Sequence, residues 1–155
     1  MPNSLDDTDV AILNILQEDC RIPHKHLAST LLTSITPIHR RIRRLVRDGF
    51  IRKYVAMIDP EKVDRALVAY THIKLKDHSQ IALTDFMDKI KTLNEVMECY
   101  HLSGDFDFLL RIAVKDMGGY SEFAIKSLSM LPNVGVVQTS FVLSEVKYKT
   151  AYFLK

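Results

Sequence analysis

The sequence has few cysteines and no long hydrophobic run. Cys20 and Cys99 lie far apart and form no C-x-x-C pair, so neither a disulfide framework nor a zinc knuckle is indicated. No segment approaches the roughly 20 unbroken apolar residues that a membrane-spanning helix requires. The first residues, MPNSLDDTDV, carry acids where a secretory signal would carry a basic region. We therefore expect a cytoplasmic protein with reduced thiols.

Motifs for catalysis or metal binding are also scarce. The chain has no G-x-S-x-G, no glycine-rich phosphate loop and no paired acid and base motif. Cys20, His24 and His26 are irregularly spaced, and Cys99 and His101 make up only two ligands on an expected strand. Neither group is a full ligand set. We expect no catalytic residues, no metal and no cofactor, and hence no enzyme.

The positive charge of the chain is concentrated in one block. The composition, 47% hydrophobic and 26% charged, is ordinary for a globular protein of one domain or two small ones. The net charge is only +2, but residues 34–53 contain seven basic side chains and a single acid, Asp48. Such a block is typical of a surface that binds a polyanion. The alternative is a solvated helix face without a partner, although i,i+4 acids usually interleave such faces.

Helical periodicity marks the first fifty residues. In LDDTDVAILNILQED, apolar residues recur at Val10, Leu13 and Leu16, and Asp6 is placed to cap the helix. A second short helix is expected to start near Pro23, and a basic third helix follows. The next segment, FIRKYVAMI, is rich in β-forming residues. These patterns predict a winged helix-turn-helix.

The third helix separates into two faces. Ile38, Ile42 and Leu45 fall at i, i+4 and i+7 and are expected to pack on the first two helices. The opposite face is expected to enter the major groove of DNA, where arginine binds phosphate oxygens or guanine edges. Hydroxyl groups near the helix start can donate to phosphates. The expected DNA-binding residues are Ser34, Thr36, His39, Arg40, Arg43, Arg44 and Arg47.

These residues resemble one family of transcription regulators. LDDTDVAILNILQEDCRIPHKHLA and SITPIHRRIRRLVRDGFI are similar to the N-terminal half of the Lrp/AsnC (leucine-responsive, feast/famine) family. The resemblance implies a sequence-specific DNA-binding transcription regulator. One departure lies before the third helix, where the family usually has Gly-Leu-Ser and this chain has Leu32-Thr33-Ser34. Because glycine adopts positive φ without strain, its loss predicts a longer or differently shaped turn.

The remaining residues alternate between strand and helix patterns. ALVAYTHIKLK, EVMECYHL, FDFLLRIAV and residues 134–147 read as strands, with helices expected around residues 83–90 and 120–131. This βαββαβ order, with helices on one face of an antiparallel sheet, predicts a ferredoxin-like α+β domain. We expect a DNA-binding domain over residues 1–52, a linker or hinge over 53–64 and a second domain over 65–155.

Several expected strands are apolar on both faces. In the last strand Val137, Phe141 and Leu143 lie opposite Val134 and Val136. Helices on one face only would leave much of this surface exposed, so we expect the second face to pack on another subunit. A homodimer would also present two basic helices to the two half-sites of a palindromic double-stranded DNA site.

The second domain resembles the effector-sensing RAM domain of the same family. ECYHLSGDFDFLLRIAVKDMGGYSEF matches its V-x-G-D-[YF]-D type loop. The resemblance implies that a free amino acid binds near this loop, between dimers that assemble into a ring, commonly an octamer. An aspartate of the loop can pair with an α-ammonium; alternatively, the loop is only a hairpin turn. The expected effector-binding residues are Leu102, Ser103, Gly104, Asp105, Phe106, Asp107, Val137 and Thr139.

Another departure and two further functions remain open. Val137-Gln138-Thr139 stands where the family often has Thr-x-Thr, so we expect a different or larger apolar ligand, or no response to a ligand at all. Sirohaem decarboxylases resemble the same architecture and use histidine and arginine around a tetrapyrrole, but they need no concentrated basic helix. A stand-alone amino-acid sensor that has lost DNA binding is disfavoured by the arginine cluster of residues 40–47.

Overall fold

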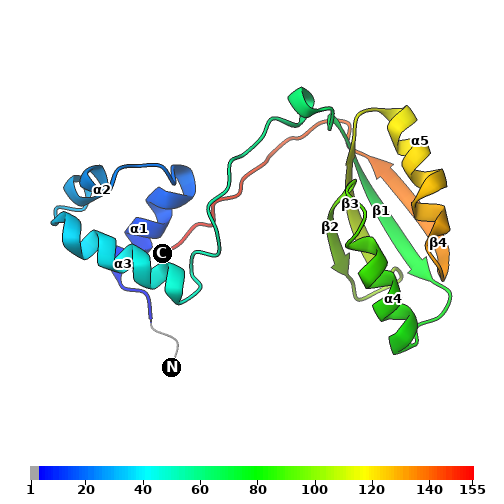
Figure 1. Ribbon diagram of the computed structural model, residues 1–155, viewed down its shortest axis with the longest axis horizontal. Coiled ribbons are helices and arrows are strands. Elements are labelled where there is room, and N and C mark those ends of the chain that lie inside the picture. The colour runs from blue at the N-terminus through cyan, green and yellow to red at the C-terminus, as the bar shows by residue number, and fades with distance from the viewer. Residues whose placement is uncertain (1–3) are drawn as a thin grey trace. The chain divides into compact units, whose positions relative to one another are not determined.

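The computed structural model describes residues 4–155, which form two compact units (Figure 1). The first unit comprises the chain up to residue 57 together with residues 146–155, and the second comprises residues 58–145. Residues 1–3 of the expected 1–52 domain lie outside the described residues. The last ten residues pack with the helices, whereas the sequence pattern placed all of residues 65–155 in the second domain.

Three helices build the first unit: α1 (Asp7–Glu18), α2 (His24–Thr30) and α3 (Ile35–Arg47). Their apolar faces meet in one core, in which Ile12, Leu27, Ile38 and Leu45 are fully buried. The predicted seam of α3 is therefore confirmed, since Ile42 is also buried there. At about 1.5–3 kcal/mol for each large apolar side chain removed from water, this core accounts for the packing of three short helices.

The ends of these helices follow from local chemistry. Asp6 caps α1: its side chain accepts from the backbone N–H of Asp9, and the Asp9 side chain accepts from the backbone N–H of Asp6. Gly49 follows α3 with φ +81°. Between α2 and α3, Leu32 has φ +51° and a side chain that is 94% exposed. The turn therefore keeps the left-handed conformation that glycine favours, in a residue that adopts it with strain.

The expected β-rich segment is not a strand in this structure. Residues 50–58 are all described, and none of them is assigned to a strand. Tyr54, Val55 and Met57 are about half exposed or more. High β propensity favours a strand only where a neighbouring strand pairs with it, and the sheet formed by the described residues consists of β1 to β4 alone.

The C-terminal segment packs on α1. The Gln17 carboxamide bonds the backbone of Tyr152 twice, accepting from its N–H at 2.7 Å and donating to its carbonyl at 3.1 Å. Asn14 Nδ2 donates to the carbonyl of Leu154 at 3.3 Å, and the Leu154 side chain packs on the helical core. These contacts explain why residues 146–155 belong to the first unit.

The second unit is a four-stranded antiparallel sheet with the order β2-β3-β1-β4. This order and the βαββαβ sequence confirm the ferredoxin-like α+β prediction. The last strand is shorter than predicted, because β1 offers it no further partner once Val142 has bonded Val68. The elements in chain order are η1 (Pro60–Val63), β1 (Leu67–Leu75), α4 (Gln80–Ile90), β2 (Val96–His101), β3 (Phe108–Val114), α5 (Met117–Lys126), η2 (Leu128–Met130) and β4 (Val134–Phe141).

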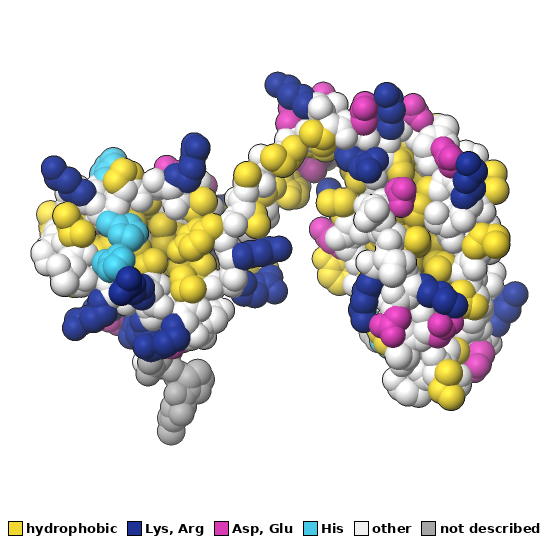
Figure 2. Space-filling model, in the orientation of Figure 1, with side chains coloured by type: hydrophobic (Ala, Val, Ile, Leu, Met, Phe, Trp, Pro, Cys, Tyr) yellow, Lys and Arg dark blue, Asp and Glu magenta, His cyan; other side chains and the backbone are white. Residues whose placement is uncertain are grey.

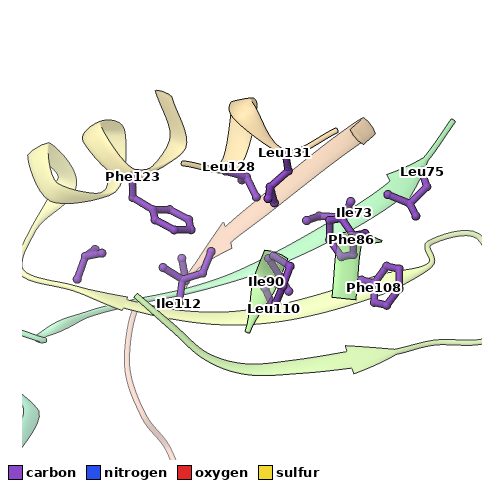
Figure 3. Packing of buried hydrophobic residues seen from close by; sticks show 12 residues of the cluster. Ile73, Leu75, Phe86, Ile90, Phe108, Leu110, Ile112, Phe123, Leu128 and Leu131 are labelled. Atoms are coloured by element: carbon purple, nitrogen blue, oxygen red, sulfur yellow. The ribbon is translucent and has the colours of Figure 1, made fainter. Parts of the chain in front are cut away.

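One face of this sheet carries the core of the second unit. Alternate residues of β1 and β3 point at the helices, where their side chains converge with those of α4 and α5 (Figure 3). The rings of Phe86 in α4 and Phe108 in β3 lie 4.6 Å apart between centroids. The opposite face of β1 is more open, with Tyr70 and Lys74 exposed.

Candidate nucleic-acid interface and ligand loop

The charged face of α3 forms a groove on the first unit. Figure 2 shows Lys and Arg side chains gathered beside histidines on this unit. Six of the seven expected DNA-binding residues line the groove; the exception is Ser34, which is the exposed N-cap of α3 and makes no side-chain cap bond. The lining residues are Asp6, Thr36, His39, Arg40, Arg41, Arg43, Arg44 and Arg47.

Two arginines of the groove point to solvent. Arg40 and Arg43 are exposed, and neither forms an ion pair with any acid in residues 4–155. His39 lies beside them on α3, and its ring centroid is 5.4 Å from that of His24 in α2. Unpartnered guanidinium groups on an exposed helix face are suited to bind phosphate oxygens or the guanine edge in the major groove.

Two other arginines of α3 are held by acids of α1. Asp9 is fully buried, and its two carboxylate oxygens accept from Arg41 Nη1 at 2.8 Å and from Arg44 Nη2. Arg41 Nη1 also lies 2.6 Å from Asp6 Oδ2. The backbone N–H of Asp9, followed by Arg41, lowers the pKa of the Asp6 carboxyl below its ordinary value of 3.8. Arg44, expected on the DNA face, is thus tied to the protein's own core.

The sequence pattern explained Asp6 by helix capping alone. That reading accounts for the capping box, which the structure contains, but not for the two ion pairs with α3. Spacing alone could not identify the held pair: Arg41 and Arg44 lie three residues apart and face the same side of α3, but so do Arg40 and Arg43. Arg47 also has an acid beside it, since its Nε lies 2.8 Å from Asp48 Oδ1.

The expected ligand loop turns tightly between β2 and β3. Gly104 has φ +125°, a conformation that favours glycine. The backbone N–H of Leu102 donates to the carbonyl of Asp107 at 2.8 Å, which closes the loop. Ser103 and Asp105 are exposed at its tip, whereas Leu102 is half-buried. The tip therefore offers a carboxylate and a hydroxyl to solvent.

Asp107 at the end of this loop already has partners within the chain. Its Oδ2 accepts from the backbone N–H of Leu75 at 2.7 Å, and both of its carboxylate oxygens lie 3.0 Å from His78 Nε2. Its own N–H donates to the carbonyl of Ile73 at 2.9 Å. The side chain thus ties the loop to the end of β1, so a ligand ammonium would have to share this carboxylate with His78.

The remaining expected ligand residues lie on two faces of the sheet. Phe106 is half-buried, with its ring centroid 5.2 Å from that of His72. Thr139 in β4 faces the helices: its Oγ1 lies 2.9 Å from Thr71 Oγ1 and 2.6 Å from the Tyr120 hydroxyl. Val137, on the same side of β4, pairs with Ile73 and is partly exposed. Ile73 therefore contacts both Val137 and the backbone of Asp107.

Residues 4–155 contain neither a metal-binding cluster nor a membrane-spanning helix. No group of three or more His, Cys, Asp or Glu side chains there is arranged to hold a metal ion. No helix in this part of the chain combines the length and the apolar character needed to cross a membrane.

Comparisons with known proteins match both units. Residues 5–52 match the model for a winged helix-turn-helix DNA-binding domain, and residues 68–152 match that for the Lrp/AsnC ligand binding domain. The leucine-responsive regulatory proteins of Klebsiella pneumoniae and Escherichia coli (strain K12) are 37% identical over 151 residues, covering 97% of this chain and 92% of each relative.

Solved structures agree with this match. A transcriptional regulator from Neisseria meningitidis, crystallised as a complex with L-Met, has a TM-score of 0.91 and 34% identity, and the match covers 96% of both chains. An AsnC family transcriptional regulator from Agrobacterium tumefaciens has a TM-score of 0.90 and 36% identity, with 94% of this chain and 95% of that chain covered.

A helix-turn-helix with an exposed basic helix and a separate ligand-binding α+β domain together define a ligand-modulated DNA-binding regulator. The chain belongs to the Lrp/AsnC family of transcription regulators. The sequence resemblance to this family is thereby confirmed, and the tetrapyrrole-enzyme and stand-alone-sensor readings are not favoured.

Proposed function

We propose that the outward face of α3 binds the major groove of double-stranded DNA, with Arg40 and Arg43 as its principal contacts. The observation that carries this proposal is the exposure of these two guanidinium groups in a groove where neighbouring Arg41 and Arg44 are neutralised by acids. Thr36, His39 and Arg47 border the same groove and add contacts to phosphates. Ser34, exposed at the start of α3, can donate to a phosphate as well.

A selection experiment tests this proposal. The full chain is mixed with a random-sequence duplex library, the bound duplexes are sequenced, and the selected duplex is then titrated at several salt concentrations. Affinity should fall steeply with salt, because arginine contacts release counterions from the phosphates. A chain that enriches no sequence and shows no salt-dependent binding would contradict the proposal. Adding sirohaem in parallel and recording absorbance tests the tetrapyrrole reading.

A second part of the proposal concerns assembly. The sheet face that carries no helices bears Val68 opposite Ala113, Tyr70 opposite Arg111, and Leu109 opposite His72. The apolar part of such a sheet face is normally covered, and a second copy of the chain covers it while presenting two α3 helices to one palindromic site. We propose a homodimer that assembles further into a ring, as an octamer, in the cytoplasm.

Light scattering on the purified chain tests this assembly. Leu109→Arg places a charge on the open sheet face and should reduce the measured mass to that of a smaller species. Ile81→Arg, on the exposed surface of α4, is the matched control and should leave the mass unchanged, because Ile81 is 83% exposed away from this face. Equal masses for wild type and Leu109→Arg would exclude this face as the interface.

The ligand is proposed to be a free amino acid with an apolar side chain. Residues 102–107 supply a tight turn, and Val137 and Thr139 lie on the strand that pairs with Ile73, next to Asp107. A similar regulator was crystallised with L-Met, and the leucine-responsive relatives are named for another apolar amino acid. Exposed Asp105 is a candidate partner for the α-ammonium, and Asp107 is another if His78 yields its place.

Thermal shift with each of the twenty amino acids tests the ligand class. A ligand that binds only the folded chain raises the midpoint of unfolding, because it stabilises that chain by RT ln(1 + L/Kd), where L is the free ligand concentration. We expect the largest rise from an apolar amino acid such as leucine or methionine. A screen in which no amino acid shifts the midpoint would contradict this part of the proposal, without bearing on DNA binding.

A further inference from the structure

We propose that Asp9 is a positioning residue for DNA recognition: it sets the rotation of α3 about its axis, and Arg41 and Arg44 serve this clamp rather than DNA. The inference rests on the proposed DNA binding by the outward face of α3. It extends that proposal by assigning a function to Asp9 of α1 and by removing Arg44 from the set of DNA contacts.

The geometry of the clamp is complete. Asp9 lies in the first turn of α1 with no exposed surface. Its Oδ1 accepts from Arg41, and its Oδ2 accepts from Arg44 and from the backbone N–H of Asp6 at 3.2 Å. No buried side-chain nitrogen or oxygen of residues 4–155 is left without a hydrogen-bond partner. Every hydrogen bond that this buried carboxylate needs is therefore supplied by α3 and the helix cap.

Burial makes this arrangement obligatory for the folded unit. A carboxylate removed from water is costly unless it is paired and hydrogen-bonded, so conformations of α3 that release Arg41 or Arg44 from Asp9 are disfavoured. The exposed acid Asp6 adds a second partner for Arg41 at the edge of the clamp. The two guanidinium groups thus hold one side of α3 against α1.

Because the clamp fixes one side of α3, it also fixes the direction of the outward face that is proposed to bind DNA. Successive residues of a helix are rotated by about 100° around its axis, so the directions of Arg40 and Arg43 follow from those of Arg41 and Arg44. Arginine contacts to base edges require donors to be placed within hydrogen-bond distance of specific atoms. A change in the rotation of α3 would misplace Arg40 and Arg43 on the bases while leaving their charge near the phosphates.

A direct DNA contact and a clamp make opposite predictions. If Arg44 bound phosphate, removing it would weaken binding to every duplex and make the salt dependence shallower. If Arg44 positions α3, removing it lowers the affinity for the selected duplex more than the affinity for a scrambled one. The ratio of the two affinities separates the alternatives, because a loss of stability alone changes both affinities together.

Asp9→Asn in the full chain is the first test, with anisotropy titrations of the duplex selected by the wild-type chain and of a scrambled duplex. We expect the ratio of the two affinities to fall by about tenfold, the scale of one misread base pair. Asp7→Asn is the matched control, because Asp7 is an exposed acid in the same turn of α1 and its substitution makes the same change in net charge. An unchanged ratio in Asp9→Asn, or the same fall in Asp7→Asn, would refute the clamp.

Arg44→Gln and Arg43→Gln keep the test decisive if Asp9→Asn does not fold. We expect Arg44→Gln to lower the ratio with an unchanged salt slope, and Arg43→Gln to reduce the slope by about one contact. A reduced slope in Arg44→Gln would assign Arg44 to DNA and refute the clamp. If the wild-type chain prefers no duplex, the proposed DNA binding is overturned, and the clamp with it. If the wild-type chain prefers its selected duplex and the variants keep the same affinity ratio, the clamp alone is overturned.

Discussion

The outward face of α3 and the loop of residues 102–107 were both expected to bind partners, yet the structure leaves them in different states. Arg40 and Arg43 extend into solvent with no acid of residues 4–155 paired to them. Asp107 is instead bonded to Leu75 and lies against His78. The helix presents charges that are available for an external partner, whereas the loop uses its inner acid to hold its own shape.

The difference shows what a charged residue contributes at each place. On α3, Asp9 holds Arg41 and Arg44, whereas Arg40 and Arg43 form no ion pair with an acid of residues 4–155 and can be assigned to the partner. In the loop, Asp105 is exposed, so it is a better candidate for an external partner than Asp107. Substitutions that remove one kind of residue while keeping the other should therefore separate binding from stability.

The largest effect is expected from Arg40→Ala combined with Arg43→Ala. Each substitution should cost about 1–3 kcal/mol of binding free energy to the selected duplex if the arginine reads a base. The free energy of unfolding should hardly change, because both side chains are exposed. Anisotropy titration and urea denaturation measure the two quantities. Unchanged DNA affinity in the double variant would remove α3 from the interface.

Asp107→Ala should lower stability and leave DNA affinity almost unchanged, the reverse of the arginine substitutions. The N–H of Leu75 loses its acceptor, so the free energy of unfolding should fall by about 1–3 kcal/mol, while DNA affinity without ligand stays close to wild type. The thermal shift produced by the best amino acid should change as well. Asp105→Ala is the control and should alter stability by less than about 0.5 kcal/mol. Equal losses of stability and DNA affinity in Asp107→Ala would contradict the separation of the two sites.

Leu32→Gly should stabilise the first unit. A left-handed conformation costs a residue with a side chain about 1–2 kcal/mol, and substitution by glycine removes this cost. Glycine also makes the unfolded chain more flexible, which offsets about 0.5–1 kcal/mol of the gain in stability. A net gain of about 0.5–1 kcal/mol is expected in urea denaturation, since the exposed Leu32 side chain loses no packing. Leu32→Ala keeps the strain and should show no such gain. A destabilised Leu32→Gly would mean that the turn is not strained.

The smallest effect concerns pH. The pKa of Asp6 is lowered in the folded state, so its charged form contributes stability that is present above 3.8 and is lost as the pH falls through the lower folded value. The difference in unfolding free energy between wild type and Asp6→Asn should therefore be constant near neutral pH and should shrink toward zero as the pH falls below 3.8. Urea denaturation at several pH values measures it. A difference that persists in acid would contradict the ion pair with Arg41.

Periodicity predicted what depends on one element at a time. The buried seam of α3, the cap of α1 and the succession of strands and helices over residues 67–141 all follow from spacing that is visible in the chain. The resemblance also pointed to the turn at Leu32, where the structure retains a positive φ. Local patterns carry this information because a helix or strand face repeats at a fixed interval.

Contacts between distant segments could not be predicted in this way. The bond between Gln17 and Tyr152 joins residues 135 positions apart, and neither side chain differs from an ordinary exposed residue in sequence. Likewise, nothing local to Arg44 distinguishes it from Arg43; only the position of Asp9 on α1 does. Tertiary packing therefore decided which arginines are free, and the sequence prediction of Arg44 as a DNA contact stays untested.

Amide chemical-shift changes during titration with the selected duplex report which residues contact DNA. We expect the largest changes in residues 34–47, around Arg40 and Arg43, and little change in the signals of residues 102–107 in the absence of an amino acid. Changes confined to the second unit, or none at saturating duplex, would contradict the assignment of α3 as the DNA-binding face.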